Sequence, residues 1–524
     1  MKNRRLIVPA LLLSMTGYAQ KDIGHFSGSF DTYNQYYLKD DKTGAVQPQD
    51  KIGSNNFLKL DYSYKKLTAG LQFEAYLPSI AGYPYNINDA KLVNKYIRYD
   101  HQKFSLVVGD FYEQFGSGLV FRSWENRPIG INNALQGVNI GISPLKFLDL
   151  KFLYGRQRKV LDYANSNIRG FDANINFSKM ANDDPKTKIT GGFSVISRYQ
   201  LYTGPDPDFP ATVNATSTRV DISGGVASLS LEYVNKGKDP HEANNYDQTS
   251  GEAFLSNFTY TKNNFGATVS LRALENMDFR AERESIQSTG LMNYVPALTR
   301  QHDYLTTNIY VYNAQAMGEI GGQIDLFYNA PKGSGFGGKH GSQFSLNFSH
   351  YGGRDDTDKL FSVGDTKYFH DLNIEWKKKW SEKWTTVLLY QNIFYNKQVI
   401  EGEPLPDVKT NTVVLNTIYK YAKKKAFRFE LQHLATKEDK GNWAAALTEF
   451  SFAPKWSFYL SDLYNYGKTD THYYNIGGSY TQGGTRFGLS YGRQRAGLFC
   501  VGGVCRYVPA ATGFTATLIT TFNN

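Results

Sequence analysis

The sequence predicts an all-β protein, a transmembrane up-and-down antiparallel β-barrel of about 24–26 strands with long extracellular loops and short periplasmic turns. Three observations predict it: an export signal, short segments in which apolar and polar residues alternate, and connections that are short and long in turn. The composition agrees, because 15% of the residues are aromatic although the mean hydropathy is −0.46. A barrel stays polar on average, since only alternate residues of each strand meet lipid.

Residues 1–19 are predicted to be a cleaved signal peptide. The segment has a basic start, an apolar run too short to span a bilayer, and small residues at the cleavage site. In chain order these are Lys2, Arg4 and Arg5, the run from Leu6 to Leu13, and Gly17-Tyr18-Ala19. The remainder, residues 20–524, is expected to be one outer-membrane β-barrel domain, so we predict the bacterial cell outer membrane as its location.

The clearest strands are windows of strict alternation. Such a pattern puts the apolar and the polar residues on opposite faces of a strand. The windows are 58–64, 71–77, 148–154, 227–233, 372–377 and 427–432. Their polar positions carry many charges, which suit a water-filled lumen better than the surface of a soluble sandwich.

The last predicted strand bears on membrane insertion. Phe514, Ala516, Leu518 and Phe522 share one of its faces, and two Asn residues follow. An aromatic residue near the chain end resembles the signal read by the outer-membrane assembly machinery. We therefore expect that machinery as a partner during biogenesis, and outer-membrane lipid as the partner of the finished barrel.

The connections between the windows have two lengths. Lys65-Lys66 and Gly483-Gly484 are short turns, whereas 78–91 and 276–302 are long polar loops. Short turns at one end and long loops at the other are typical of transmembrane barrels. The strand count is odd, about 25, and a barrel with both termini on one side needs an even number. The parity fails between residues 315 and 380: either a strand is missed near 354–363, or two of the strands expected there are one. We favour the first explanation, which gives about 26 strands.

A barrel of this size is expected to contain something in its lumen, because barrels of about 22 strands carry a plug. Strand-like sequence begins by Gly24, which leaves no room for a separate plug domain. We therefore expect loops to close the lumen. The best candidate is residues 110–136, which mix acids, arginines and aromatics without alternation, and the second is residues 293–304.

Five charged residues of the first segment are candidates for a pore constriction: Asp110, Glu113, Arg122, Glu125 and Arg127. The two arginines facing the acids would set a transverse field across a pore. The alternative is a folded surface loop whose exposed ion pairs contribute less than about 1 kcal/mol each.

Cys500 and Cys505 are the only cysteines. In an exported protein such a pair predicts a disulfide, here across the last loop. Closing so small a ring contributes roughly 2 kcal/mol in the chain-entropy model. The alternative, a two-thiolate metal site, lacks a second Cys pair and a nearby His.

Segments 110–136, 293–304 and 500–509 carry a family resemblance. They resemble an uncharacterised family of large outer-membrane β-barrel proteins of Bacteroidota-type bacteria, classed as a domain of unknown function. The resemblance extends along most of the mature chain. It implies a location and a fold, and it implies no activity.

The sequence favours no enzyme. The nine histidines are scattered, and neither a metal-protease spacing, a Gly-x-Ser-x-Gly elbow nor a phosphate loop is present. We therefore predict no catalytic residue, cofactor or metal. The net charge of +10 is interspersed along the chain, which argues against nucleic-acid binding.

The leading hypothesis is a porin-like channel or transporter for polar solutes. The alternative is a structural or interaction barrel, part of a multi-protein outer-membrane complex, whose long loops dock a lipoprotein or a surface partner. A hydrolase with its site on the barrel rim is the third and least favoured reading.

Overall fold

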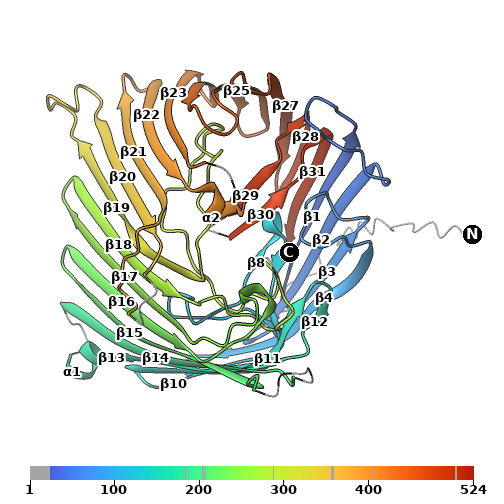
Figure 1. Ribbon diagram of the computed structural model, residues 1–524, viewed down its shortest axis with the longest axis vertical. Helices are drawn as coiled ribbons and strands as arrows, with labels where there is room; N and C mark the ends of the chain where they lie inside the picture. Colours follow the sequence, from blue (N-terminus) through green and yellow to red (C-terminus); the bar gives the residue numbers. More distant parts are fainter. Residues whose placement is uncertain are drawn as a thin grey trace, which may run out of the picture.

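The computed structural model describes residues 24–524 apart from 183–185, 203, 205, 207, 287, 356–358, 405 and 502–503. The predicted signal peptide lies outside the described residues. The described chain forms a closed antiparallel barrel of 24 strands, seen end-on in Figure 1. The predicted fold class is therefore confirmed.

The barrel strands follow one another around the wall in chain order. They are β1 (His25–Leu38), β2 (Ile52–Tyr64), β3 (Leu67–Tyr76), β4 (Asp89–His101), β5 (Phe104–Phe111), β10 (Leu135–Leu145), β11 (Leu148–Lys159), β13 (Asn167–Asn176), β14 (Thr187–Tyr199), β15 (Thr212–Gly224), β16 (Ala227–Lys236), β17 (Gly251–Lys262), β18 (Phe265–Glu275), β19 (Gly318–Ala330), β20 (Ser342–Gly352), β21 (Lys367–Lys379), β22 (Trp384–Tyr395), β23 (Val408–Ala422), β24 (Lys425–Ala435), β25 (Trp443–Phe452), β26 (Trp456–Asn465), β27 (Thr471–Gln482), β28 (Thr485–Gln494) and β31 (Ala511–Asn523). A two-residue strand, β12 (Asp162–Tyr163), pairs with the end of β11.

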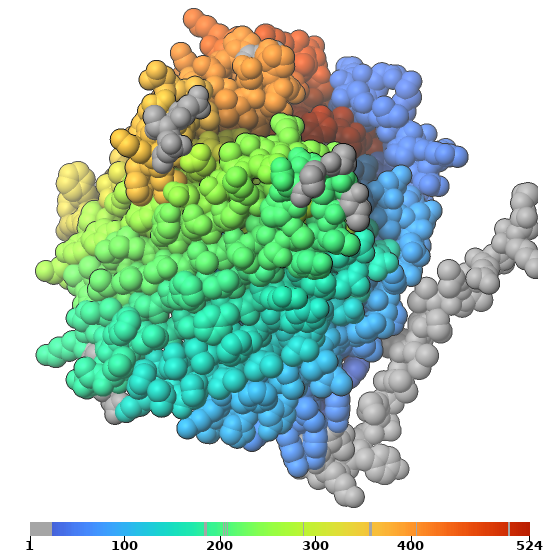
Figure 2. Space-filling model, turned by 60° about the horizontal axis from the view of Figure 1, so that its bottom comes forward, coloured from blue at the N-terminus to red at the C-terminus, as the bar shows by residue number. Residues whose placement is uncertain are grey.

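The barrel closes where the first and last strands pair. The ladder between β1 and β31 runs from Ser27 opposite Asn523 to Leu38 opposite Thr512. Each barrel strand is therefore hydrogen-bonded on both sides, and the sheet keeps no free edge for another chain to extend. Figure 2 shows the outer surface of the cyan and green strands as a continuous wall.

The two faces of the wall are inverted relative to a soluble protein. In β3, Leu71 and Phe73 are 42% and 43% exposed, whereas Gln72 and Glu74 between them are 3% and 2% exposed. The apolar set faces outward, as contact with lipid requires, and the polar set faces the lumen. No helix in the described part of the chain is long and apolar enough to cross a membrane.

Tight turns gather at one end of the barrel, called here the turn end, and long connections at the other, the loop end. The preference for a strand near 354–363 is wrong: the described residues between β20 and β21 form a loop that closes on itself. Gly353 donates its backbone N–H to Thr366, at 2.8 Å, and accepts one from Gly364, at 3.0 Å. These bonds join residues of the same loop, so the segment adds no strand to the wall.

The remaining elements belong to connections. They are β6 (Gln114–Phe115), β7 (Phe121–Arg122), β8 (Glu125–Asn126), η1 (Arg127–Ile129), β9 (Ile131–Asn132), α1 (Phe177–Ala181), η2 (Glu242–Asn244), α2 (Lys397–Glu401), β29 (Gly497–Val501) and β30 (Val504–Val508). Figure 1 shows β8, β29 and β30 inside the ring of strands.

Candidate functional site in the barrel lumen

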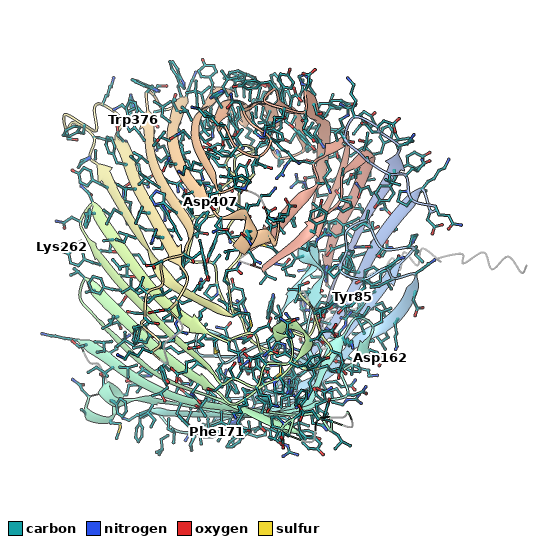
Figure 3. All side chains as sticks on the ribbon, in the orientation of Figure 1. Tyr85, Asp162, Phe171, Lys262, Trp376 and Asp407 are labelled. Carbon is teal, nitrogen blue, oxygen red and sulfur yellow. A yellow bond between two sulfur atoms is a disulfide. The ribbon has the colours of Figure 1, made fainter. Side chains whose placement is uncertain are left out.

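The lumen is filled at the loop end. In β22, the inward residues Gln391, Ile393 and Tyr395 next to the loop are buried, whereas Thr385 and Val387 near the turn are partly exposed. β16 follows the same pattern, with buried inward residues only in its loop-end half. The filling comes from the connections described next, and Figure 3 shows side chains inside the ring of strands, with Tyr85 among them.

The longest filling segment joins β18 to β19 and is called here the plug loop, residues 276–317. Its apolar side chains form two buried clusters with inward residues of the wall. Met277, Phe279 and Met292 belong to one cluster, and Tyr310 and Tyr312 to the other. The plug loop thus packs against the wall through two buried apolar clusters, as side chains do in the core of a soluble domain.

Hydrogen bonds place the plug loop across the lumen. On one side, Gln157 of β11 donates to the carbonyl of Leu291 at 2.8 Å. On the other, Gln432 of β24 accepts from the backbone N–H of Thr306 at 2.9 Å. β11 and β24 lie far apart around the wall, so the plug loop spans the lumen between them.

A buried ion pair ties the plug loop to its own flanking strands. Arg272 of β18 donates through Nε to Glu319 of β19, at 2.9 Å, and also reaches the carbonyl of Pro296. Glu319 accepts in addition from the Tyr312 hydroxyl, at 2.5 Å, and from the Gln315 N–H, at 2.7 Å. The Glu319 carboxylate therefore holds the plug loop directly at Tyr312 and Gln315.

A second inward segment, the inner loop, comprises residues 112–134 between β5 and β10. It pairs with the plug loop through the backbone: Arg122 donates to Met292, at 2.8 Å, and Tyr294 donates to Gly118, at 2.9 Å. It also meets the wall at Glu232 of β16, which accepts from the Ser117 N–H at 2.9 Å. The two loops thus form one packed body.

Two of the five residues predicted for a constriction meet each other, because Arg127 donates to Glu125 at 2.9 Å. Arg127 also pairs with Asp31 of β1. Arg122 lies instead over the Tyr294 ring, with its guanidinium carbon 4.3 Å from the ring centre.

The other two lie against the wall. Glu113 pairs with Lys151 of β11 at 2.8 Å. Asp110, at the end of β5, accepts from the Tyr163 hydroxyl at 2.7 Å. Arg127 therefore faces one of the three acids, Glu125, and a role of these residues in narrowing a conducting path stays a prediction.

Cys500 and Cys505 form the predicted disulfide, which joins β29 to β30. This disulfide hairpin, residues 497–508, folds toward the lumen rather than away from it. Arg506 donates to the carbonyl of Pro128 in the inner loop, at 3.0 Å, and to that of Gly82. Burial lowers the pKa of Arg506.

Several cavities remain beside these loops, among them one of about 780 Å³ and one of about 690 Å³. Leu498 and Arg506 line both, so the disulfide hairpin separates them. Phe499 and Cys500 face the larger cavity, and Cys505 faces the smaller one. In the described residues, no group of three His, Cys, Asp or Glu side chains is placed to hold a metal ion.

The loop end holds one further buried charge cluster. Asp239 pairs with Arg198 at 2.8 Å and with Lys236 at 3.5 Å, all fully buried. Burial opposes the charge of Asp239, but Arg198 and Lys236 outweigh it and lower the pKa of Asp239. Burial also lowers the pKa of the neighbouring His241.

Sequence reasoning named residues 293–304 as a lumen segment but missed most of the plug loop, and Arg272 and Glu319 with it. The available signal was length together with apolar content, because 276–317 contains Met277, Phe279 and Met292 without strand alternation. The alternating windows 71–77 and 227–233 place Glu74 and Glu232 on the lumen-facing side of their strands. Both are buried partners of other groups, Glu74 pairing with Arg158.

Comparison with known proteins gives one family. A family model described as "Family of unknown function (DUF6029)" matches residues 1–522. No curated protein matches the chain.

Similar solved structures include a chain of the E. coli P pilus tip assembly intermediate PapC-PapD-PapK-PapG, with a TM-score of 0.51 and 9% identity over 98% of this chain and 63% of that chain. The siderophore receptor PirA from Pseudomonas aeruginosa gives a TM-score of 0.41 and 8% identity over 96% and 81% of the two chains. OccK3 (OpdO) from the same organism gives a TM-score of 0.37 and 12% identity over 79% and 96%. At such low identity the first likeness shows a shared fold and nothing more.

Proposed function

We propose that this chain, which belongs to the Family of unknown function (DUF6029), is a plugged outer-membrane channel or transporter for polar solutes. The predicted membership of an uncharacterised family is thereby confirmed, and the Bacteroidota origin stays a prediction. In this proposal the loop end faces the exterior and the turn end the periplasm, as in other barrels of this class.

The observation that carries the proposal is the plug. The wall has 24 strands, and a barrel of that size has a lumen wide enough to conduct unless something fills it. The plug loop and the inner loop fill its loop-end half, while inward residues near the turns stay partly exposed. A lumen closed by its own loops beside two residual cavities is an arrangement suited to controlled passage.

Conductance of the refolded protein in a planar lipid bilayer tests this function. We expect small conductance steps, and a reversal potential under a salt gradient that reports the sign of the preferred ion. A barrel that stays closed at every applied voltage, and that also takes up no polar solute in liposomes, would contradict the proposal.

One observation favours a second candidate, an interaction barrel. Aromatic rings from two neighbouring loops gather at the loop end: Phe209 lies 4.7 Å from Tyr202 and 5.9 Å from Tyr246, ring centre to ring centre. The pilus assembly intermediate with a similar fold contains several proteins by its own description. In this second proposal, this group of rings, of which Tyr246 is exposed, docks an outer-membrane lipoprotein or surface partner.

Co-purification in mild detergent separates the two candidates. A stoichiometric partner that is lost from the Phe209→Ala variant would favour the interaction barrel. A lone monodisperse barrel would favour the channel.

A further inference from the structure

We propose that the larger lumen cavity is a binding site for a small organic anion, a carboxylate or phosphate ester attached to an aromatic or other flat apolar body. This inference names a solute class for the proposed function and rests on it. The site is formed where the disulfide hairpin meets β1, the inner loop and the plug loop.

The charge of the lining carries the proposal. Four arginines line the cavity, Arg127, Arg300, Arg495 and Arg506, and the one acidic residue of the lining is Asp371. Asp371 is already engaged, since it lies 3.0 Å from Nε2 of His302 in the plug loop. The lining thus has an excess of positive charge.

Two of these arginines have acidic partners and two do not. Arg127 pairs with Asp31 and Glu125, and Arg300 pairs with Glu375. Arg506 donates only to backbone carbonyls, and Arg495 donates to the carbonyl of Ala496 at 3.2 Å. Among the described residues, no carboxylate lies within ion-pair distance of either.

An arginine enclosed by protein without an acid retains a fork of donors that matches a carboxylate or a phosphate. Arg506 is partly enclosed by two aromatic rings, with its guanidinium carbon 5.8 Å from the Phe499 ring centre and 6.0 Å from that of Tyr83. Both acid-free arginines come from the connection between β28 and β31: Arg495 precedes the disulfide hairpin, and Arg506 lies in its second strand, β30. Both line the cavity.

The rest of the lining fits the body of such a solute. Aromatic side chains from several elements surround the space, namely Tyr33, Phe57, Tyr310, Tyr312, Phe369 and Phe499. A volume of about 780 Å³ lies within the range of small-molecule sites. Aromatic walls with a few placed charges select a solute that is apolar at one end and anionic at the other.

Equilibrium binding to the full-length protein in detergent tests the site without depending on conductance. The probes are benzoate, phenyl phosphate and benzamide, three aromatic compounds of which benzamide is neutral. We expect benzoate, phenyl phosphate or both to bind, and benzamide to bind at least about tenfold more weakly, since hydrogen bonds to a charged group contribute about 1.5–3 kcal/mol. The preferred anion distinguishes a carboxylate from a phosphate ligand.

The variants Arg495→Gln and Arg506→Gln are expected to weaken binding of the preferred anion by about tenfold each. Arg486→Gln is the matched control, because Arg486 lies on β28 near the turn end and does not line the cavity. If a Gln variant fails to fold, the wild-type protein still decides the question, because its anion binding must weaken as salt is raised.

Three results would overturn the site: no binding of either anion, binding of benzamide as tight as that of the preferred anion, or binding of the preferred anion unchanged in both folded Gln variants. A conducting barrel without anion binding would refute this inference alone. Anion binding by a barrel that neither conducts nor takes up polar solute in liposomes would instead refute the channel or transporter.

Discussion

At the scale of single residues, the lumen is held together by buried charges that have partners. Glu74 pairs with Arg158, Asp172 with Arg219, and Glu319 with Arg272, and these side chains are almost wholly buried. An acid left alone in such surroundings would be costly, because burial removes its hydration. Glu319 thereby holds the plug loop against the wall, whereas the other two pairs join strands of the wall to each other.

Replacing Glu319 by Ala is expected to loosen the plug, since Glu319 accepts hydrogen bonds from Tyr312 and Gln315 of the plug loop. Single-channel recording should show larger or more frequent openings than in the wild type. Glu449→Ala is the control: Glu449 lies in the wall opposite Arg428, and its partners do not include the plug loop. Equal conductance in the two variants would count against the anchoring role.

Replacing Glu74 by Ala is expected to lower the free energy of unfolding by about 3–5 kcal/mol, because Arg158 is left as a buried charge without its acid. Urea unfolding, monitored by tryptophan fluorescence, measures this change in the free energy of unfolding. Asp100→Ala breaks the exposed pair with Arg98 and should change the free energy by less than about 1 kcal/mol. Similar losses of unfolding free energy in both variants would mean that burial does not determine how strongly these ion pairs stabilise the protein.

His241 predicts a pH dependence of stability. Burial lowers its pKa in the folded chain, although Asp278 and Asp239 oppose this while Lys236 and Arg280 add to it. The unfolded chain then takes up a proton first as pH falls below about 6.5, so the folded state loses stability on acidification.

The test of this dependence is urea unfolding of the wild type and of His241→Gln between about pH 8 and pH 5. The wild type should lose more stability than the variant over this interval. If the free energy of unfolding changed with pH in parallel for the two proteins, His241 would stay neutral in both the folded and the unfolded state or titrate equally in them.

At the scale of elements, alternation predicted the strands because each strand turns one face outward and the other to the lumen. In β3 the exposed residues are Leu71 and Phe73, and the buried ones are Gln72 and Glu74. The pattern could not predict what fills the lumen, because the plug loop contacts residues far away in the chain, such as Gln157 and Gln432. The disulfide was predictable from two cysteines in a chain with a predicted export signal, but its inward placement was not.

The disulfide hairpin separates the two cavities, so its rigidity is expected to limit passage between them. The variant with Cys500→Ser and Cys505→Ser should show a higher or noisier conductance, because the ring closure that contributes roughly 2 kcal/mol is lost. Adding a thiol reductant to the wild type should reproduce the effect. The double variant itself should not respond to reductant, and a response there would contradict this interpretation.

At the scale of the whole molecule, the protein is a closed wall around a body made of its own loops. The two ends of the plug loop meet at the wall: Asn276 donates to Met317, at 3.0 Å, and Met277 to Ala316, at 2.7 Å, through the backbone. The strands β18 and β19 are fully paired with each other and with their other neighbours. The wall therefore does not need the plug loop in order to close.

This separation of wall and plug allows the most direct test. Residues 278–315 are replaced by a short glycine-containing turn, folding is checked by the heat-dependent gel shift of a barrel, and single-channel conductance is compared with that of the wild type. We expect small or rare openings in the wild type and a large, steady conductance in the folded variant. A folded variant that conducts no more than the wild type would show that the plug loop does not close the lumen.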